Sequence, residues 1–284
     1  LVSEFIGTRI EAGNRDAYIR GLECNLRQFE RAFPDKPIAQ VSVPNDIVSY
    51  LNSSGSKPET WIVKLNRIRS MYEFAVKRKY LPSSVLEEYN TIEKPMTTPK
   101  ETEIFTVQEM RWILEYATPE TTAWFAIGAF CGIRSSELNR LDWSQINLAQ
   151  GHIRMTAAKT KTRSMRLVDI PDCLKAWLEP YAKPFGPICE FDNFDTIIKQ
   201  LTKRIQKDYP EFKWKKNAMR HSYISHRLAV TNNENLVAQQ AGNTPQMIHK
   251  HYRALVTLEE GKAWFSVMPA KQPDNVIQLI QQTA

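Results

Sequence analysis

The sequence predicts a mainly α protein with a small β-sheet or hairpin, built as an N-terminal helical bundle followed by an α+β domain. Three observations predict this class. Over most of the chain, apolar side chains recur at steps of three and four residues, which is the period of an amphipathic helix. Two short segments alternate apolar and polar residues, which is the period of a β-strand. A stretch rich in proline, threonine and charge separates the all-helical part from the part that holds these two segments.

The first domain is expected over residues 1–95 and consists of helices alone. One apolar stripe is formed by Tyr18, Leu22, Leu26, Phe29 and Phe33. The stripe of a second helix, which follows Pro58, is formed by Trp61, Leu65, Ile68, Tyr72 and Ala75. Between them, VPNDIVSYL predicts a short helix that starts near Asn45 or Asp46. Arginine and lysine lie mostly off both stripes, so the bundle is expected to have a basic surface.

Residues 96–103 are expected to form an exposed linker, because prolines and charges interrupt the apolar pattern there. The second domain then covers residues 104–268 and begins with a helix at TVQE, where Thr106 and Glu109 can form a capping box. The segment TTAWFAIGAFCG is apolar nearly all round, which predicts a central buried helix. HIRMT and MRLVDI predict a β-hairpin across AAKTKTRS. Further helices are expected from Pro171, Asn193, about Lys216, Asn233 and Thr244, followed by a polar tail over residues 269–284.

The composition narrows the class of protein. A chain of 284 residues with 42% hydrophobic residues can build real cores, which excludes a disordered or fibrous protein. The net charge of +7 favours a polyanionic partner, although a solvated basic surface is the simpler alternative. The four cysteines form no CxxC pair, so neither a zinc site nor a disulfide framework is expected. The sequence lacks a long apolar run and a signal-peptide pattern, so we expect a cytoplasmic protein with no membrane partner.

Two segments of the second domain place basic side chains where they can meet an anion. In GIRSSEL, Arg134 follows the glycine that ends the apolar helix, and Ser135 or Ser136 can cap the next helix. An arginine at such a junction can bind an anion, or it can simply pair with Glu137. The hairpin carries a basic run, formed by Lys159, Lys161, Arg163 and Arg166. Such a run suits a DNA groove or, more simply, a solvated turn.

Two further segments hold an arginine, histidines and a tyrosine. In NAMRHSY, Arg220 and His221 stand beside Met219 and Tyr223, which are expected to face the core. In TPQMIHKHYRAL, Thr244 and Pro245 begin a helix that carries HKHY. Considered alone, the tyrosine of HKHY is more simply an ordinary amphipathic residue. Taken together, the four segments favour another interpretation.

In this order and spacing, GIRSSEL, the basic hairpin, the segment around Arg220 and HKHY resemble the catalytic domain of the tyrosine recombinases, also called phage integrases. The resemblance covers nearly the whole chain. Residues 1–95, including the ending YEFAVKRKYLPSS, look like the SAM-like core-binding domain of that family. Residues 104–268 look like its catalytic domain. Four separate motifs in the right order make the resemblance more specific than any one of them.

The resemblance implies a DNA recombinase or integrase that cuts and rejoins DNA through a 3′-phosphotyrosine intermediate, without a metal or any other cofactor. Tyr252 would be the nucleophile. Arg134 and Arg220 would bind the scissile phosphate and stabilise its developing charge. Lys161, with Lys159 as the alternative, would protonate the leaving 5′ oxygen. Glu137 would support this site in a structural role.

Two positions depart from the family pattern. Asn217 stands where the family usually has the histidine of HxxR, and Asn243 stands where LGH or LGW is usual. An asparagine amide can donate a hydrogen bond to a phosphate, but it cannot accept a proton near neutral pH. We therefore expect a slower enzyme that is still competent. His221, His249 and His251 are open candidates for the missing proton acceptor.

The resemblance also implies partners. The expected partner is double-stranded DNA, bound by a homotetramer across two DNA sites, with a monomer or weak oligomer in its absence. The side chains expected to contact DNA are Lys77, Arg78, Lys159, Arg163, Arg166 and His221. Two alternatives stay open: a recombinase-like DNA-binding protein with impaired catalysis, and a type IB topoisomerase-like enzyme that relaxes DNA. The target sequence and the element served, a mobile element or a chromosomal system, are not fixed by these motifs.

Overall fold

The computed structural model describes residues 1–98, 101–156, 165–191, 193–253 and 255–270. The chain divides into two compact units, residues 1–100 and residues 101–284, so the division falls inside the stretch expected to be a linker. Each unit has buried apolar clusters of its own. The two units are described separately below.

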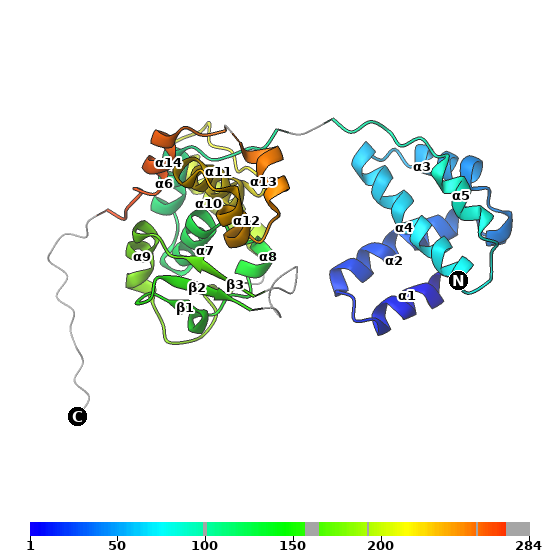
Figure 1. Cartoon of the computed structure of the whole chain (residues 1–284), viewed down its shortest axis with the longest axis horizontal. Coiled ribbons are helices and arrows are strands. Elements are labelled where there is room, and N and C mark those ends of the chain that lie inside the picture. Colours follow the sequence, from blue (N-terminus) through cyan, green and yellow to red (C-terminus); the bar gives the residue numbers. More distant parts are fainter. Residues whose placement is uncertain (99–100, 157–164, 192, 254, 271–284) are drawn as a thin grey trace, which may run out of the picture. The chain divides into compact units, whose positions relative to one another are not determined.

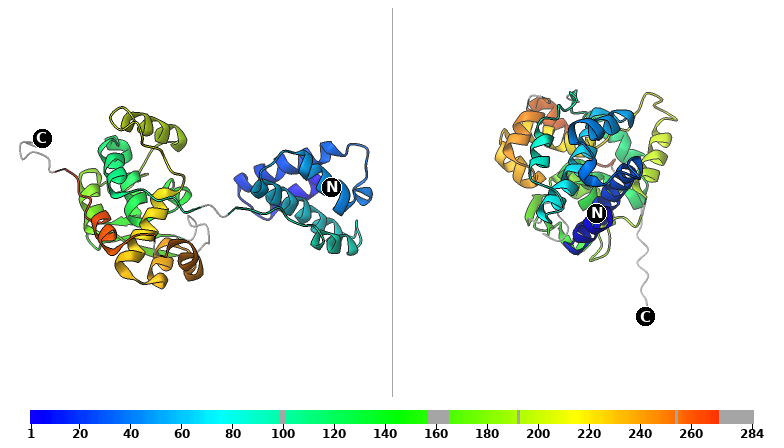
Figure 2. Two further views of the ribbon diagram at one scale, coloured as in Figure 1. Left: turned by 90° about the horizontal axis from the view of Figure 1, so that it is seen from above. Right: turned by 90° about the vertical axis from the view of Figure 1, so that its right-hand side faces the viewer.

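In the part of the first unit that the structure describes, the regular elements are all helical (Figures 1 and 2). Its α-helices are α1 (Val2–Glu11), α2 (Asp16–Ala32), α3 (Val48–Ser53), α4 (Pro58–Lys77) and α5 (Ser84–Asn90). A 3₁₀ turn, η1 (Ile38–Gln40), and one turn of π-helix, η2 (Val43–Ile47), connect α2 to α3. The short helix predicted from VPNDIVSYL is therefore a π-turn that continues directly into an α-helix.

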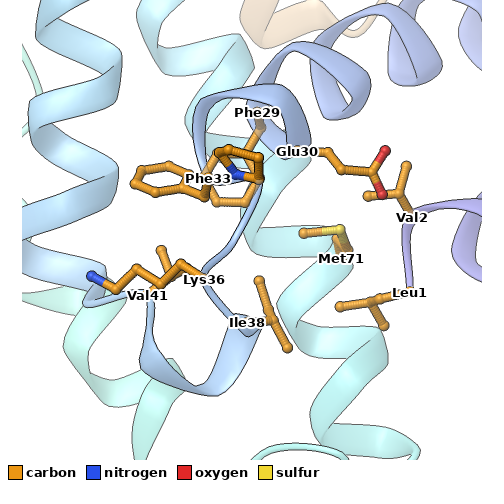
Figure 3. A pocket seen from close by; sticks show the side chains of 10 residues that line it. Leu1, Val2, Phe29, Glu30, Phe33, Lys36, Ile38, Val41 and Met71 are labelled. Atoms are coloured by element: carbon orange, nitrogen blue, oxygen red, sulfur yellow. The ribbon is translucent and has the colours of Figure 1, made fainter.

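The core of the first unit follows the predicted stripes with one correction. All five residues predicted for the stripe of α4 are buried. On α2, Ile19 is buried with Leu22, Leu26 and Phe29, whereas Tyr18 is exposed. Tyr18 and Ile19 lie four and three residues before Leu22, so the helical period alone does not choose between them, and it is the packing of the bundle that buries Ile19. An apolar cavity of about 260 Å³ lies between α1, the end of α2 and α4, lined by residues that include Leu1, Phe29, Phe33, Ile38 and Met71 (Figure 3).

The second unit combines helices with a small sheet (Figure 1). Its α-helices are α6 (Val107–Glu115), α7 (Pro119–Cys131), α8 (Ser135–Leu138), α9 (Asp172–Leu178), α10 (Phe194–Ile205), α11 (Ala218–Thr231), α12 (Glu234–Ala241), α13 (Pro245–Tyr252) and α14 (Leu258–Trp264). The 3₁₀ turns are η3 (Trp143–Gln145) and η4 (Glu179–Tyr181). The predicted capping box is present, because the Thr106 hydroxyl accepts from the backbone N–H of Glu109 while the carboxylate of Glu109 accepts from that of Thr106.

The sheet has three antiparallel strands in the order β1 (Ile146–Asn147), β2 (His152–Met155) and β3 (Arg166–Asp169). The predicted hairpin is confirmed as the β2–β3 pair, with Met155 opposite Arg166. The short strand β1 was not predicted, because two residues are too few to show an alternation. Along β3, Arg166 and Val168 are buried and the residues between and after them are exposed. The period of a strand therefore points Arg166 toward the interior.

Helices α7 and α11 form the centre of the second unit. All but two residues of α7, those at its first turn, are buried, as the all-apolar pattern predicted. α11 packs against α7, α12, α13 and α14. Met219 and Tyr223 on α11 are buried, as expected. Among the described residues, no helix combines the length and the apolar character that crossing a membrane requires.

Candidate active site

Arg134 lies where α7 ends and α8 begins. Gly132 ends α7 in the left-handed conformation, with φ of +59°, and its missing side chain leaves room for the ring of Tyr223. Arg134 itself occupies the N-cap position of α8, and no side chain caps that helix, so the prediction of a serine cap was wrong. The guanidinium of Arg134 donates to Glu137 Oε1 at 3.2 Å, to the carbonyl of Gly242 and to Asn243 Oδ1 at 3.4 Å.

Glu137 joins two arginines in the interior. Its side chain is fully buried, and Oε2 accepts from Arg166 Nη2 at 2.5 Å while Oε1 accepts from Arg134. Arg166 also donates from Nε to the carbonyl of Gln240 at 3.0 Å, and only 4% of its side chain is exposed. This position corrects the expectation that Arg166 contacts DNA at the surface. Instead, Arg166 ties β3 to α8 and α12, and thereby helps to hold Glu137 against Arg134.

Arg220 lies in the first turn of α11 and is largely buried. Its Nη1 donates to the carbonyl of Gly132 at 2.7 Å. Its Nη2 is buried and has no hydrogen-bond partner among the described residues. Burial, and then the charge of Arg134, lower the pKa of Arg220 to about 10. The group therefore stays charged at neutral pH with one guanidinium donor left for an anion.

Asn217 immediately precedes α11. Its backbone is left-handed, with φ of +60°, a conformation that asparagine tolerates better than most residues. Asn217 is exposed, and together with Arg220 it lines a cavity of about 490 Å³. Trp124, Phe194 and Trp214 also line it. The amide of Asn217 is thus available beside the largely buried guanidinium of Arg220.

Tyr252 ends α13, the helix that Thr244 caps and Pro245 opens as predicted. The tyrosine is 7% exposed, and its hydroxyl lies 2.8 Å from Nδ1 of His221. Burial raises the pKa of Tyr252, and the positive charge of Arg220 opposes that rise. The structure therefore places the tyrosine hydroxyl against His221, and the charge of Arg220 acts on it.

A polar network that the motifs did not reveal supports this site. The Tyr223 hydroxyl donates to Gln240 Oε1 at 2.8 Å, and the amide of Gln240 donates to Asp169. Arg227 donates to Asp169 Oδ2 at 3.1 Å. These contacts fix α11 and α12 against β3, which also carries Arg166. Nothing in the sequence pairs these residues, because they belong to elements that meet only in the tertiary structure. The alternation of apolar and polar residues on β3 was the one available signal of burial, and it applied to Arg166 alone.

The charges at the site favour an anion. Arg134, Arg166 and Arg220 carry three positive charges, and Glu137 carries one negative charge, which leaves a surplus of two positive charges. A partly buried surplus of this kind is stabilised by an anion with several acceptor oxygens. A phosphate diester has that chemistry, and planar guanidinium groups match its geometry. Within the described ranges, no group of three or more His, Cys, Asp and Glu side chains could hold a metal ion.

The remaining predicted residues belong to the first unit or fall outside the described residues. Lys159, Lys161 and Arg163 fall outside the described residues. Lys77 and Arg78 are exposed at the end of α4 in the first unit, where with Arg9 they line a cavity of about 550 Å³. Arg78 lies over the ring of Phe74, with 5.4 Å between its guanidinium carbon and the ring centroid.

Distant relatives share part of this sequence. No protein-family model matches it. Tyrosine recombinase XerC of Vibrio cholerae is 24% identical over 207 residues, which covers 66% of this chain and 65% of XerC. Tyrosine recombinase XerD of Staphylococcus epidermidis is 21% identical over 216 residues, which covers 71% of this chain and 68% of XerD. The match to XerC thus spans just under two thirds of that relative's length.

Solved structures share the fold at lower identity. The Tn1549 transposon integrase in complex with a circular intermediate DNA gives a TM-score of 0.66 at 16% identity, covering 92% of this chain and 98% of that one. A lambda integrase dimer bound to a COC′ core site gives a TM-score of 0.68 at 13% identity, covering 89% of this chain and 95% of that one. A lambda integrase tetramer bound to a Holliday junction gives a TM-score of 0.67 at 11% identity, covering 86% of this chain and 76% of that one. This chain therefore has the fold of these integrases, and its function has to be argued from its site.

Proposed function

We propose that this protein is a site-specific DNA recombinase that cuts and rejoins DNA through a 3′-phosphotyrosine intermediate. One observation carries the proposal: the Tyr252 hydroxyl lies 2.8 Å from His221, and the charge of the neighbouring Arg220, whose buried Nη2 has no hydrogen-bond partner among the described residues, acts on that tyrosine. The distant similarity to XerC and XerD and the shared integrase fold support the same reaction class.

In the proposed reaction, the Tyr252 oxygen attacks the phosphorus of a DNA phosphodiester, and the bond from phosphorus to the 5′ oxygen breaks. Arg220 and Arg134 donate hydrogen bonds to the non-bridging oxygens, where negative charge increases in the transition state. Lys161, or Lys159 in its place, donates a proton to the leaving 5′ oxygen. A 5′-hydroxyl of another strand then attacks the phosphotyrosine and reverses the step.

The two asparagines fit a role as hydrogen-bond donors. Asn243 turns its Oδ1 toward Arg134, because a guanidinium offers only donors, and this leaves the amide N–H groups of Asn243 free for a phosphate. Asn217 lines the cavity beside Arg220 and can donate in the same way. Neither amide can accept a proton, so the enzyme is proposed to cut more slowly than one with a histidine at position 217.

The proposed partner is double-stranded DNA. Lys77, Arg78 and the hairpin residues Lys159 and Arg163 are proposed to contact its phosphates. The net charge of +7 makes that binding steeply dependent on salt. Because the lambda integrase neighbour is a tetramer on a Holliday junction, a homotetramer across two DNA sites is proposed for this chain.

The test is a covalent trap. The full chain is incubated with a pool of nicked duplexes of randomised sequence, in which the short fragment released by cleavage diffuses away and prevents rejoining. We expect a protein–DNA adduct that survives denaturation, absent in Tyr252→Phe and present in Tyr18→Phe, which changes an exposed tyrosine of the first unit. Tyr252→Phe should still bind DNA, because the change removes only the attacking oxygen. Sequencing of the trapped DNA gives the target.

Three outcomes would contradict this proposal. DNA binding without any adduct would identify a DNA-binding protein on a recombinase fold. An adduct that persists in Tyr252→Phe would place the nucleophile elsewhere. An adduct accompanied by relaxation of supercoiled plasmid, with no strand exchange between two sites, would identify a topoisomerase-like enzyme.

A further inference from the structure

The environment of His221 distinguishes it from the other histidines of the chain. Its Nδ1 lies 2.8 Å from the Tyr252 hydroxyl, and the two ring centroids are 5.7 Å apart. His226 is engaged elsewhere, with the carbonyl of Ser222 and the ring of Trp264. His249 is exposed and pairs with Glu234, and His251 is exposed on the outer side of α13. His152 lies on β2. Among the histidines, all of which lie in the described ranges, His221 is the one that hydrogen-bonds to the proposed nucleophile.

We propose that His221 is a catalytic residue that accepts the phenolic proton of Tyr252, in place of the histidine that position 217 lacks. The proposal rests on the proposed function. A phenol is a poor nucleophile unless a base accepts its proton, and Nδ1 of His221 lies within hydrogen-bond distance of the Tyr252 hydroxyl. Asn217 and Asn243 cannot fill this role, because a side-chain amide does not accept a proton near neutral pH.

Tyr252 and His221 exchange one proton during cutting and rejoining. As the Tyr252 oxygen bonds to phosphorus, its proton moves to His221 Nδ1, and the bond to the 5′ oxygen breaks. The leaving 5′ oxygen takes its proton from the hairpin lysine or from water. On rejoining, the incoming 5′-hydroxyl gives its proton to the hairpin lysine or to water as it bonds to phosphorus, and the displaced tyrosine oxygen recovers its proton from His221. One histidine thus serves as base for cutting and as acid for rejoining.

The electrostatic environment keeps the ring of His221 neutral, so that it can accept a proton. Burial, then the charge of Arg220, then His251 lower the pKa of His221 below its ordinary 6.5, so the ring is mainly neutral at pH 7. Glu260 on α14 acts on His226, Glu234 on α12 pairs with His249, and Cys131 ends α7 as a buried thiol. A bound phosphate would offset the charge of Arg220 and make the protonated ring easier to form.

The test compares His221→Gln with His152→Gln, the same change at a histidine of β2. Gln still offers hydrogen-bonding groups but cannot take a proton. With the DNA recovered by the covalent trap, we expect His221→Gln to form the adduct about 10²–10⁴ times more slowly, with DNA binding retained. The rate of the wild type should rise with pH through the pKa of His221 and then level off. In His221→Gln that plateau should be lost, whereas His152→Gln should keep it.

A second measurement separates proton transfer from structure. A fluorinated tyrosine at position 252 loses its proton more readily, so it should restore much of the rate in His221→Gln. A purely structural defect would not respond to it. Faster cutting in His221→Gln would overturn the proposal. It would mean that His221 holds the tyrosine back from the phosphate and does not accept its proton.

The proposal stays falsifiable even without cleavage. If the wild type forms no adduct, the recombinase function fails, and the ¹⁵N resonances of His221 in the free protein decide the second question. A Nδ1 without a proton at neutral pH, with Nε2 protonated, is the tautomer that an acceptor requires. A Nδ1 that carries its own proton would overturn the inference independently of activity.

Discussion

At the scale of single residues, the site depends on one carboxylate that faces two guanidinium groups. Glu137 is fully buried, and an ionised carboxylate in that position is tolerated only because Arg134 and Arg166 pair with it. The same pairing keeps the guanidinium of Arg134 beside Gly242 and Asn243. The position of a proposed phosphate-binding group is therefore determined by a residue that touches no substrate.

Glu137→Ala should destabilise the protein strongly. Removing one partner of a buried ion pair leaves the other charge uncompensated, which costs about 3–5 kcal/mol. Urea unfolding of the full chain checks this, with Glu115→Ala as the matched control. Glu115 is exposed on α6, and its removal should change the free energy of unfolding by no more than about 0.5 kcal/mol. Equal effects of the two changes would show that the buried carboxylate contributes nothing.

At the scale of elements, the turn from α7 to α8 depends on the absence of a side chain at Gly132. The φ of +59° is strained for other residues, and a Cβ there would lie 2.2 Å from Cδ1 of Tyr223. The carbonyl of the same glycine accepts from Arg220. One short turn therefore sets the end of the central helix, the packing of α11 and the position of an arginine of the site.

A comparison of Gly132→Ala with Gly151→Ala separates the cost of backbone strain from the cost of a clash with the Tyr223 ring. Gly151 has a similar φ of +69° and open space around its Cβ position, so alanine there should cost about 1–2 kcal/mol through strain alone. Gly132→Ala should cost about 1–3 kcal/mol more, because the Tyr223 ring has to move. Thermal and urea unfolding measure both. A Gly132→Ala variant no less stable than Gly151→Ala would contradict the packing argument.

At the scale of the whole molecule, the buried clusters divide along the chain. One cluster comes entirely from residues 1–100, and the other two come from residues 101–284. A core built from one continuous segment needs no side chain from the rest of the chain in order to close. Each segment therefore contains what it needs to fold.

We expect the fragments 1–100 and 101–284 to fold separately. Each should give a helical circular dichroism spectrum and a cooperative thermal transition, because each has its own core. In the 101–284 fragment the chemical shifts of His221 should match those of the full chain, since its contacts come from that segment. A helical fragment that melts without a cooperative transition would show that its core is incomplete.

The sequence alone determined most of the elements and the candidate residues of the site. Local physical rules govern these features: the helical stripe of α4, the capping box at Thr106 and the β2–β3 alternation each depend on residues close together in the chain. The motif order also indicated which tyrosine and which arginines to consider. Such features were predictable because their causes lie within a few residues.

Only the tertiary structure decided which of these side chains lie in contact. Arg166 belongs to the basic hairpin in sequence, yet the strand period and the buried Glu137 place it inside the fold. His221 looked no better than two other histidines until α13 placed the tyrosine hydroxyl against its Nδ1. Contacts between segments far apart in the chain depend on how whole helices pack, and that packing is a sum of many small terms which no short stretch of sequence records.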